Sequence, residues 1–158
     1  LDEWMSRLCE TYVDFSEMDV MNIPGSGAAG GIGGALGGVL GATMAQGIHK
    51  VLDIAGFGQK LKSCDLVITG EGRADIQTLR GKVPVGVLEY SRRYRAPGKS
   101  PKVILIAGRL SDKEQLLEAG FDAVLQVTPE DTPLSVALAP ATAEANITRT
   151  IKEYQANL

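Results

Sequence analysis

Three short apolar runs in the second half of the chain each precede a stretch whose apolar residues recur at helical spacing. The runs are Leu66–Thr69, Lys102–Ala107 and Asp122–Val127. The helical stretches that follow them run from Lys82 to Tyr94, from Ser111 to Ala119, and from Thr132 or Pro133 to near Tyr154. Strands that alternate with helices through short connections predict an α/β fold with a parallel sheet and right-handed crossovers.

The first part of the chain has other patterns. Trp4, Leu8 and Tyr12 recur every four residues, which predicts an amphipathic helix at the start. We expect a strand at Ile48–Ile54, and a short helix at Gly58–Cys64 that leads into the strand at Leu66.

Between these elements, the segment from Gly25 to Gly47 is uncharged and rich in glycine and alanine. A membrane-spanning helix is one interpretation, since the segment is long enough, but so much glycine inserts weakly into a bilayer. A disordered linker is another, although Ile32, Leu36 and Leu40 keep helical spacing. We favour a glycine loop that leads into a buried helix, whose glycines form a face for the close approach of another backbone.

Composition removes several classes of function. A formal net charge of −3 over 158 residues argues against nonspecific nucleic-acid binding. The two cysteines, Cys9 and Cys64, match no metal-binding spacing, and His49 is the only histidine, so a zinc site has little support. So few cysteines are typical of a reducing compartment, and we expect a cytoplasmic protein.

Polar chemistry is densest just after the first apolar run, in the segment Gly70–Lys82. We expect the strand to end in a glycine turn at residues 69–72, at the sheet edge where α/β proteins bind ligands. Carboxylates at Glu71 and Asp75 could hold Mg²⁺ or accept a proton from a hydroxyl. The remaining candidates are cations for phosphate oxygens and polar groups that orient a ligand, namely Arg73, Lys82, Gln77 and Thr78. A surface network of ion pairs is the alternative.

The segment Pro24–Gly34, with the sequence PGSGAAGGIGG, is a second candidate site. A glycine loop before a helix exposes backbone N–H groups that suit a phosphate or carboxylate. No Lys-Ser or Lys-Thr follows the glycines, so the segment is not a Walker A loop. Composition leaves anion binding and simple helix packing as open alternatives.

Taken together, PGSGAAGG, DLVITGEGRADIQTLRGKVP, ILIAGRLSD, GFDAV and ANITRTI resemble the C-terminal part of the bacterial glycerate kinases of the first type, from roughly Val20 onward. The resemblance implies phosphorylation of D-glycerate with ATP and Mg²⁺ in a cleft between two α/β domains. It implies that residues 63–158 are the C-terminal part of a Rossmann-like domain. Residues 1–62 would be the C-terminal part of the second domain, with its glycine-rich helix.

The resemblance also assigns positions. Gly25, Gly27, Ala28, Ala29, Gly30 and Gly31 match the family's glycine motif, and Gly70, Glu71, Gly72, Arg73, Asp75, Gln77, Thr78, Gly81, Lys82 and Pro84 match its second motif. We expect Asp75 to be the base, Glu71 to lie near Mg²⁺, and Arg73 and Lys82 to neutralise phosphate or the glycerate carboxylate. Ile76 departs from the polar residue that is common at its position, which removes a hydroxyl contact there.

These roles make D-glycerate and a nucleotide the expected partners, with no nucleic acid and no membrane. We expect the 158 residues to be inactive by themselves because half of the cleft would be missing. Exposed interdomain surface is expected to favour self-association into homo-oligomers. A non-catalytic α/β domain that binds a small anion with the same loops is the alternative function.

Overall fold

The computed structural model describes residues 2–157. Its contacts divide the chain into two compact units, Leu1–Gln46 and Gly47–Leu158, and each is described here by itself. The domain boundary expected between residues 62 and 63 concerns the complete protein and stays a prediction. Within residues 2–157, none of the helices combines the length and apolar character needed to cross a membrane.

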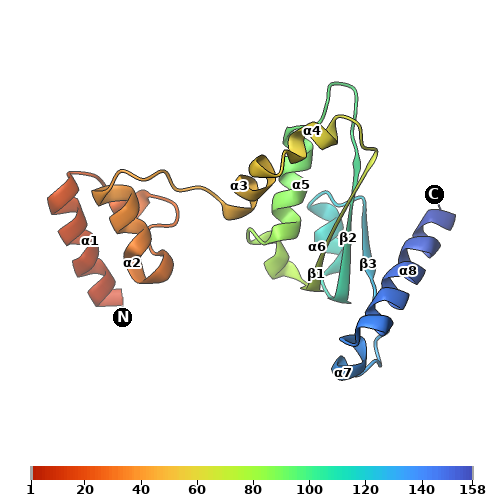
Figure 1. The fold of residues 1–158 in the computed structure, drawn as a ribbon. Helices are drawn as coiled ribbons and strands as arrows, with labels where there is room; N and C mark the ends of the chain where they lie inside the picture. Colours follow the sequence, from red (N-terminus) through yellow and green to blue (C-terminus); the bar gives the residue numbers. More distant parts are fainter. Residues whose placement is uncertain (1, 158) are drawn as a thin grey trace. The chain divides into compact units, whose positions relative to one another are not determined.

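The first unit is helical and packs through glycine. Helix α1 (Asp2–Ser16) is followed by the short 3₁₀ turn η1 (Val20–Asn22), by α2 (Ala28–Gly34) and by one π-helical turn, η2 (Ala35–Val39) (Figure 1). A Cβ atom at Gly31 would lie 2.8 Å from the Leu8 side chain, and one at Gly34 would lie 3.2 Å from the Tyr12 ring. The prediction of a packing face made of Gly30, Gly33, Gly34, Gly37 and Gly41 is therefore confirmed in part. Gly33, Gly34 and Gly37 are buried in close packing, whereas a Cβ atom at Gly30 or Gly41 would meet no atom within 4 Å.

The second unit is built on a three-stranded parallel sheet in the order β1–β2–β3. The strands are β1 (Leu66–Ala74), β2 (Lys102–Leu110) and β3 (Ala123–Gln126). The helices are α3 (Gly47–Ile54), α4 (Phe57–Leu61), α5 (Val83–Arg93), α6 (Lys113–Glu118), α7 (Leu134–Ala137) and α8 (Pro140–Ala156). The predicted α/β class and the parallel sheet are confirmed.

The core of this unit lies between the sheet and the helices α5 and α6. Val103 and Leu105 from β2 are fully buried and pack with Leu88 from α5 and Leu116 from α6. Burial of each such side chain contributes roughly 1.5–3 kcal/mol. Figure 1 shows α7 and α8 on the other side of the strands from α5. The core therefore lies on the α5 side of the sheet, whereas the far side is partly open, with Ile68 of β1 47% exposed.

Two predictions about elements are wrong. Residues 48–54 form α3 and not a strand, because Ile48 and Leu52, four residues apart, face inward: Leu52 is buried, and Ile48 packs where a side chain at Gly86 of α5 would sit. The expected glycine turn at residues 69–72 is also absent, since β1 continues through it and pairs Gly70 with Ile106 and Ala74 with Leu110.

Two smaller departures occur at helix ends. The last helix is divided into α7 and α8, and Pro140 lies in the first turn of α8, where its missing N–H is tolerated. Asp112 occupies the predicted cap position before α6, but its side chain makes no capping bond. Its Oδ2 instead accepts a hydrogen bond of 3.1 Å from the backbone N–H of Ile76. Asp112 thus ties the start of α6 to the segment after β1.

Candidate functional site

A charged cluster lies at the carboxyl end of β1. Glu71 belongs to the strand, Asp75 follows it, and Lys82 directly precedes α5. The Lys82 Nζ lies 3.7 Å from Glu71 Oε2 and 3.8 Å from Asp75 Oδ1. The side chains of Glu71 and Asp75 are only 16% and 19% exposed, whereas that of Lys82 is 40% exposed. The cluster therefore holds two partly desolvated carboxylates beside Lys82, whose ammonium group is more exposed to solvent.

Thr78 holds Glu71 and Asp75 in place through hydrogen bonds of its buried hydroxyl. It lies in the 3₁₀ turn η3 (Ile76–Leu79) and is fully buried. Its Oγ1 donates a hydrogen bond of 2.5 Å to Glu71 Oε1 and accepts one of 3.1 Å from the backbone N–H of Asp75. Asp75 Oδ1 in turn accepts a 2.9 Å bond from the backbone N–H of Gln77. This reciprocal capping fixes both carboxyl groups, and leaves Glu71 Oε2 and Asp75 Oδ2 without a hydrogen bond from these partners.

Arg73 is the outermost charge of the cluster. Its side chain is 72% exposed, and its Nε lies 3.6 Å from Asp75 Oδ2. An exposed pair of this kind contributes little to stability, so the guanidinium is free to turn toward a bound anion at small cost. Gln77 is also exposed, and of its groups only the backbone N–H takes part in the cluster.

The structure thus brings together Glu71, Arg73, Asp75, Thr78 and Lys82, as the sequence analysis expects. Gly70 and Gly72 lie in β1 itself, on either side of Glu71. The Thr78 hydroxyl, expected to orient a ligand, is engaged inside the protein with Glu71. Its contribution to the site is therefore to position a carboxylate.

The cluster can be compared with the needs of a metal ion. Over residues 2–157, His, Cys, Asp and Glu side chains form no group of three or more with metal-binding geometry. Mg²⁺ is commonly held by only one or two carboxylates, with water and substrate phosphates as its other ligands. Glu71 and Asp75 fit that mode, and they do not form a complete cage made of protein side chains.

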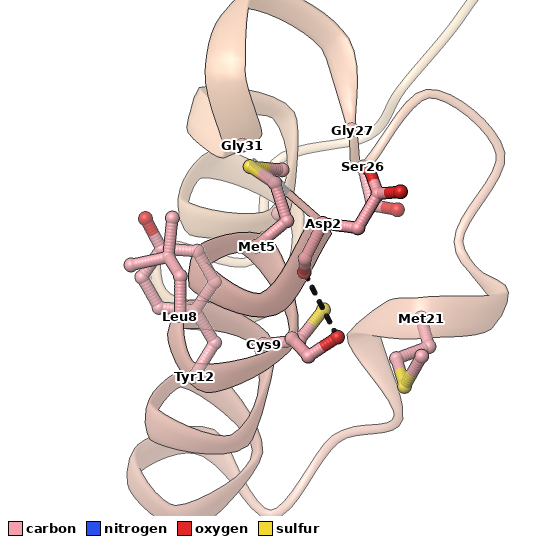
Figure 2. Close-up of a pocket in the computed structure, with 11 residues that line it drawn as sticks. Asp2, Met5, Leu8, Cys9, Tyr12, Met21, Ser26, Gly27 and Gly31 are labelled. Carbon is pink, nitrogen blue, oxygen red and sulfur yellow. Dashed lines mark hydrogen bonds between the residues drawn. The ribbon is translucent and has the colours of Figure 1, made fainter.

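The glycine motif forms a separate feature in the first unit. There, α1 and the motif enclose a cavity of about 310 Å³, lined by Met5, Leu8, Cys9, Ser26, Gly27 and Gly31 among others (Figure 2). Ala29, Gly30 and Gly31 have positive φ angles of 51°, 70° and 94°. Left-handed backbone at a non-glycine residue costs about 1–3 kcal/mol and is found most often at functional sites.

The members of this motif differ in their surroundings. Gly31 faces α1, whereas a Cβ atom at Gly27 or Gly30 would meet no other atom within 4 Å. Gly25, with a φ of 91°, lies beside the Met44 side chain. Gly31 therefore serves packing, whereas Gly27 and Gly30 are exposed, and anion binding at these two positions stays a prediction.

One positioning residue is missed by the sequence analysis. The guanidinium of Arg109, at the end of β2, donates hydrogen bonds to the carbonyl oxygens of Pro129, Glu130 and Thr132, the first and last at 3.1 and 2.6 Å. It thereby fixes the loop that connects β3 to α7. Its partners lie 20 or more residues away in the chain, so no local pattern indicates the role.

The pKa of Tyr90 is shifted by its surroundings. The hydroxyl of Tyr90 on α5 donates a hydrogen bond of 2.7 Å to Asp53 Oδ1 on α3. This bond, together with burial and the nearby negative charge, raises the pKa of Tyr90 from 10.0 to about 12. The pair joins two helices and is a structural feature of the second unit.

Comparison with known proteins shows which family this chain resembles. Residues 1–157 match the family model described as the Glycerate kinase family. The glycerate kinase of Bacillus cereus is 40% identical over 157 residues, which cover 99% of this chain and 39% of that protein. The glycerate 2-kinase of Escherichia coli is 38% identical over 128 residues, which cover 80% of this chain and 32% of that protein.

A solved structure agrees with these matches. The crystal structure of a protein from Salmonella typhimurium LT2, assigned as a glycerate kinase 2, superposes with a TM-score of 0.62 at 38% identity. The superposition covers 95% of this chain and 38% of that one. The chain therefore spans about two fifths of the length of these relatives.

Proposed function

Because this chain belongs to the glycerate kinase family, we propose that the complete polypeptide carrying it transfers the γ-phosphoryl group of ATP to a hydroxyl of D-glycerate. The observation that supports this most directly is the convergence of Glu71, Asp75 and Lys82 at the carboxyl end of β1. Phosphoryl transfer needs positioned groups and neutralised charge more than covalent chemistry by the protein, and this cluster supplies both signs of charge.

Each side chain has a role in this proposal. A glycerate hydroxyl oxygen forms the new bond to the γ-phosphorus while the bond to the ADP oxygen breaks, and Asp75 Oδ2 accepts the hydroxyl proton, which later passes to solvent. Lys82 and Arg73 neutralise phosphoryl oxygens as charge shifts toward ADP. Glu71, held by Thr78, presents Oε2 for Mg²⁺. Mg²⁺ supplies Lewis-acid neutralisation of the phosphate oxygens when it is bound.

In the same proposal the glycine motif contributes backbone donors. An anionic part of the substrate would meet the backbone N–H groups of the motif, namely those of Gly25, Gly27, Ala28, Ala29, Gly30 and Gly31. Gly27 and Gly30 are the members with open space beside them. The second motif adds Gly70, Gly72 and Gln77 as contacts for the substrate or the nucleotide. Both cysteines are free thiols, in keeping with the cytoplasm as the proposed compartment.

ADP release measured with a coupled assay on the complete polypeptide tests the proposal. We expect turnover that requires D-glycerate and Mg²⁺ together, with a phosphoglycerate as the product found by mass spectrometry. Turnover that is unchanged when D-glycerate is omitted would refute the proposed substrate. Binding of glycerate and nucleotide without any product would instead support the non-catalytic anion-binding alternative. The 158 residues alone are expected to show no turnover.

A further inference from the structure

A second cavity, of about 340 Å³, lies in the same unit as the charged cluster, and apart from Gly70, Glu71 and Gly72 its lining has no part in the chemistry proposed above. It is bounded by the carboxyl ends of β1 and β2 on one side and by α7 and α8 on the other. Its lining is mainly apolar and includes Gly70, Gly72, Ile106, Leu134, Leu138 and Ile147. Ligands of open α/β sheets bind at this edge, so the position is one where a ligand is expected.

Glycines form the floor of the cavity. A Cβ atom at Gly108 would lie 2.7 Å from the carbonyl oxygen of Gly72, so β1 and β2 approach here too closely for a side chain at position 108. A Cβ atom at Gly72, in contrast, would meet no atom within 4 Å. Because Gly72 has no side chain, the space beside it stays open, and the backbone there forms a flat surface in the cavity.

Leu134 on α7 and Leu138, directly after this helix, form the opposite wall and are unusually exposed for a cavity lining. Leu134 and Leu138 are 68% and 70% exposed, and Ile147 of α8 is 42% exposed. Arg109 keeps this wall in place, because its guanidinium holds the loop that leads into α7. The wall is therefore positioned by a polar anchor, and its apolar side chains are largely exposed.

The cavity and the charged cluster meet at the carboxyl end of β1. Successive side chains of a strand point to opposite faces, so the Glu71 carboxylate lies with Lys82 and Thr78 on the α5 face, whereas Gly70 and Gly72 face the cavity. Glu71 also borders the cavity, so a ligand that passes over this end of β1 reaches both features. A ligand that fits both features has a flat, weakly polar part for the glycine floor and an anionic part for Lys82 and Arg73. Glycerate is too small and too polar for an apolar space of this size, whereas a nucleoside triphosphate has both parts.

We propose, building on the kinase function above, that this cavity binds the base and sugar of the nucleotide, with the base lying on the backbone at Gly72 and against Leu134 and Leu138. The phosphates then extend toward Lys82 and Arg73. Gly72 is in this proposal a residue that determines nucleotide binding, and Arg109 is a positioning residue.

Two substitutions in the complete polypeptide test the proposal. Gly72→Val fills the open space with a side chain, and Leu138→Lys places a charge on the exposed wall without a change to the strand. Each should weaken binding of adenosine, measured by titration calorimetry, by about tenfold or more. Ile54→Lys, at an α3 side chain that is 87% exposed and outside the cavity, is the control and should bind adenosine normally.

The outcomes separate this inference from the kinase proposal. Adenosine carries no phosphate and needs no turnover, so its binding can be measured even if the glycerate assay fails. Unchanged adenosine affinity in both variants, or no saturable adenosine binding at all, would overturn the inference. So would a structure of the complete polypeptide in which one of its own side chains fills the cavity. A rise in the KM for ATP with an unchanged KM for glycerate would support it further.

Discussion

The hydroxyl of Thr78 should be the most sensitive single group in the charged cluster. Thr78→Val keeps the shape of the side chain, so no large cavity is created, but it removes the hydrogen bond to Glu71 and the one from the Asp75 N–H. A hydrogen bond to a charged group contributes about 1.5–3 kcal/mol and a neutral one about 0.5–1.5 kcal/mol. The free energy of unfolding should therefore fall by roughly 2–4.5 kcal/mol, a large part of a typical total of about 5–15 kcal/mol.

Urea unfolding of the complete polypeptide, followed by circular dichroism, measures this change. Thr78→Ser restores the hydroxyl and should recover most of the lost stability. Thr11→Val is the matched control, because Thr11 is exposed and its hydroxyl bonds only to the Arg7 carbonyl of its own helix; its effect should stay within about 0.5 kcal/mol. An unfolding midpoint of Thr78→Val equal to that of Thr11→Val would refute the role given to Thr78.

Two further predictions concern the packing of each unit. Gly33→Ala should strongly destabilise the first unit, because the added methyl group would overlap the carbonyl oxygen of Gly25, whereas Gly27→Ala meets open space. Hydrogen exchange of the α1 and α2 amides would show this, and equal protection in both variants would contradict it. Tyr90→Phe should change how stability depends on pH: since folding raises the pKa of Tyr90 from 10.0 to about 12, the wild-type protein should keep this contribution below pH 10 and lose it as pH rises to 12. Equal slopes of unfolding free energy against pH for both proteins between those values would show that the bond to Asp53 does not stabilise the fold.

The elements with strong local signals could be predicted from the sequence. The apolar runs at Val67 and Val103 are long enough, and their helices periodic enough, to indicate strands and helices in the observed order. The residues of the cluster could be predicted because they come directly after an apolar run, although Glu71 and Arg73 lie within the strand itself. Even the role of Thr78 has a local signal, since Asp75 and Thr78 stand three residues apart, as in a reciprocal helix cap.

The remaining features depend on contacts that the sequence does not display. Gly70 and Gly72 indicate a turn locally, but the close approach of β2 at Gly108 makes them part of a strand. The segment that forms α3 is too short for its apolar pattern to distinguish a helix from a strand. Packing against α5 determines that it is a helix. Arg109 finds its carbonyl partners only once the sheet has formed.

The most direct test of the whole account is the turnover number of Asp75→Asn in the complete polypeptide. Asparagine keeps the size of the side chain but cannot accept the glycerate proton, and a general base typically contributes about 10²–10⁴-fold to the rate. We expect kcat to fall by that factor while the variant stays folded. Asp14→Asn, an exposed substitution on α1, should retain the normal kcat. A folded Asp75→Asn variant with a kcat within about twofold of the wild-type value would contradict the assignment of Asp75 to phosphoryl transfer.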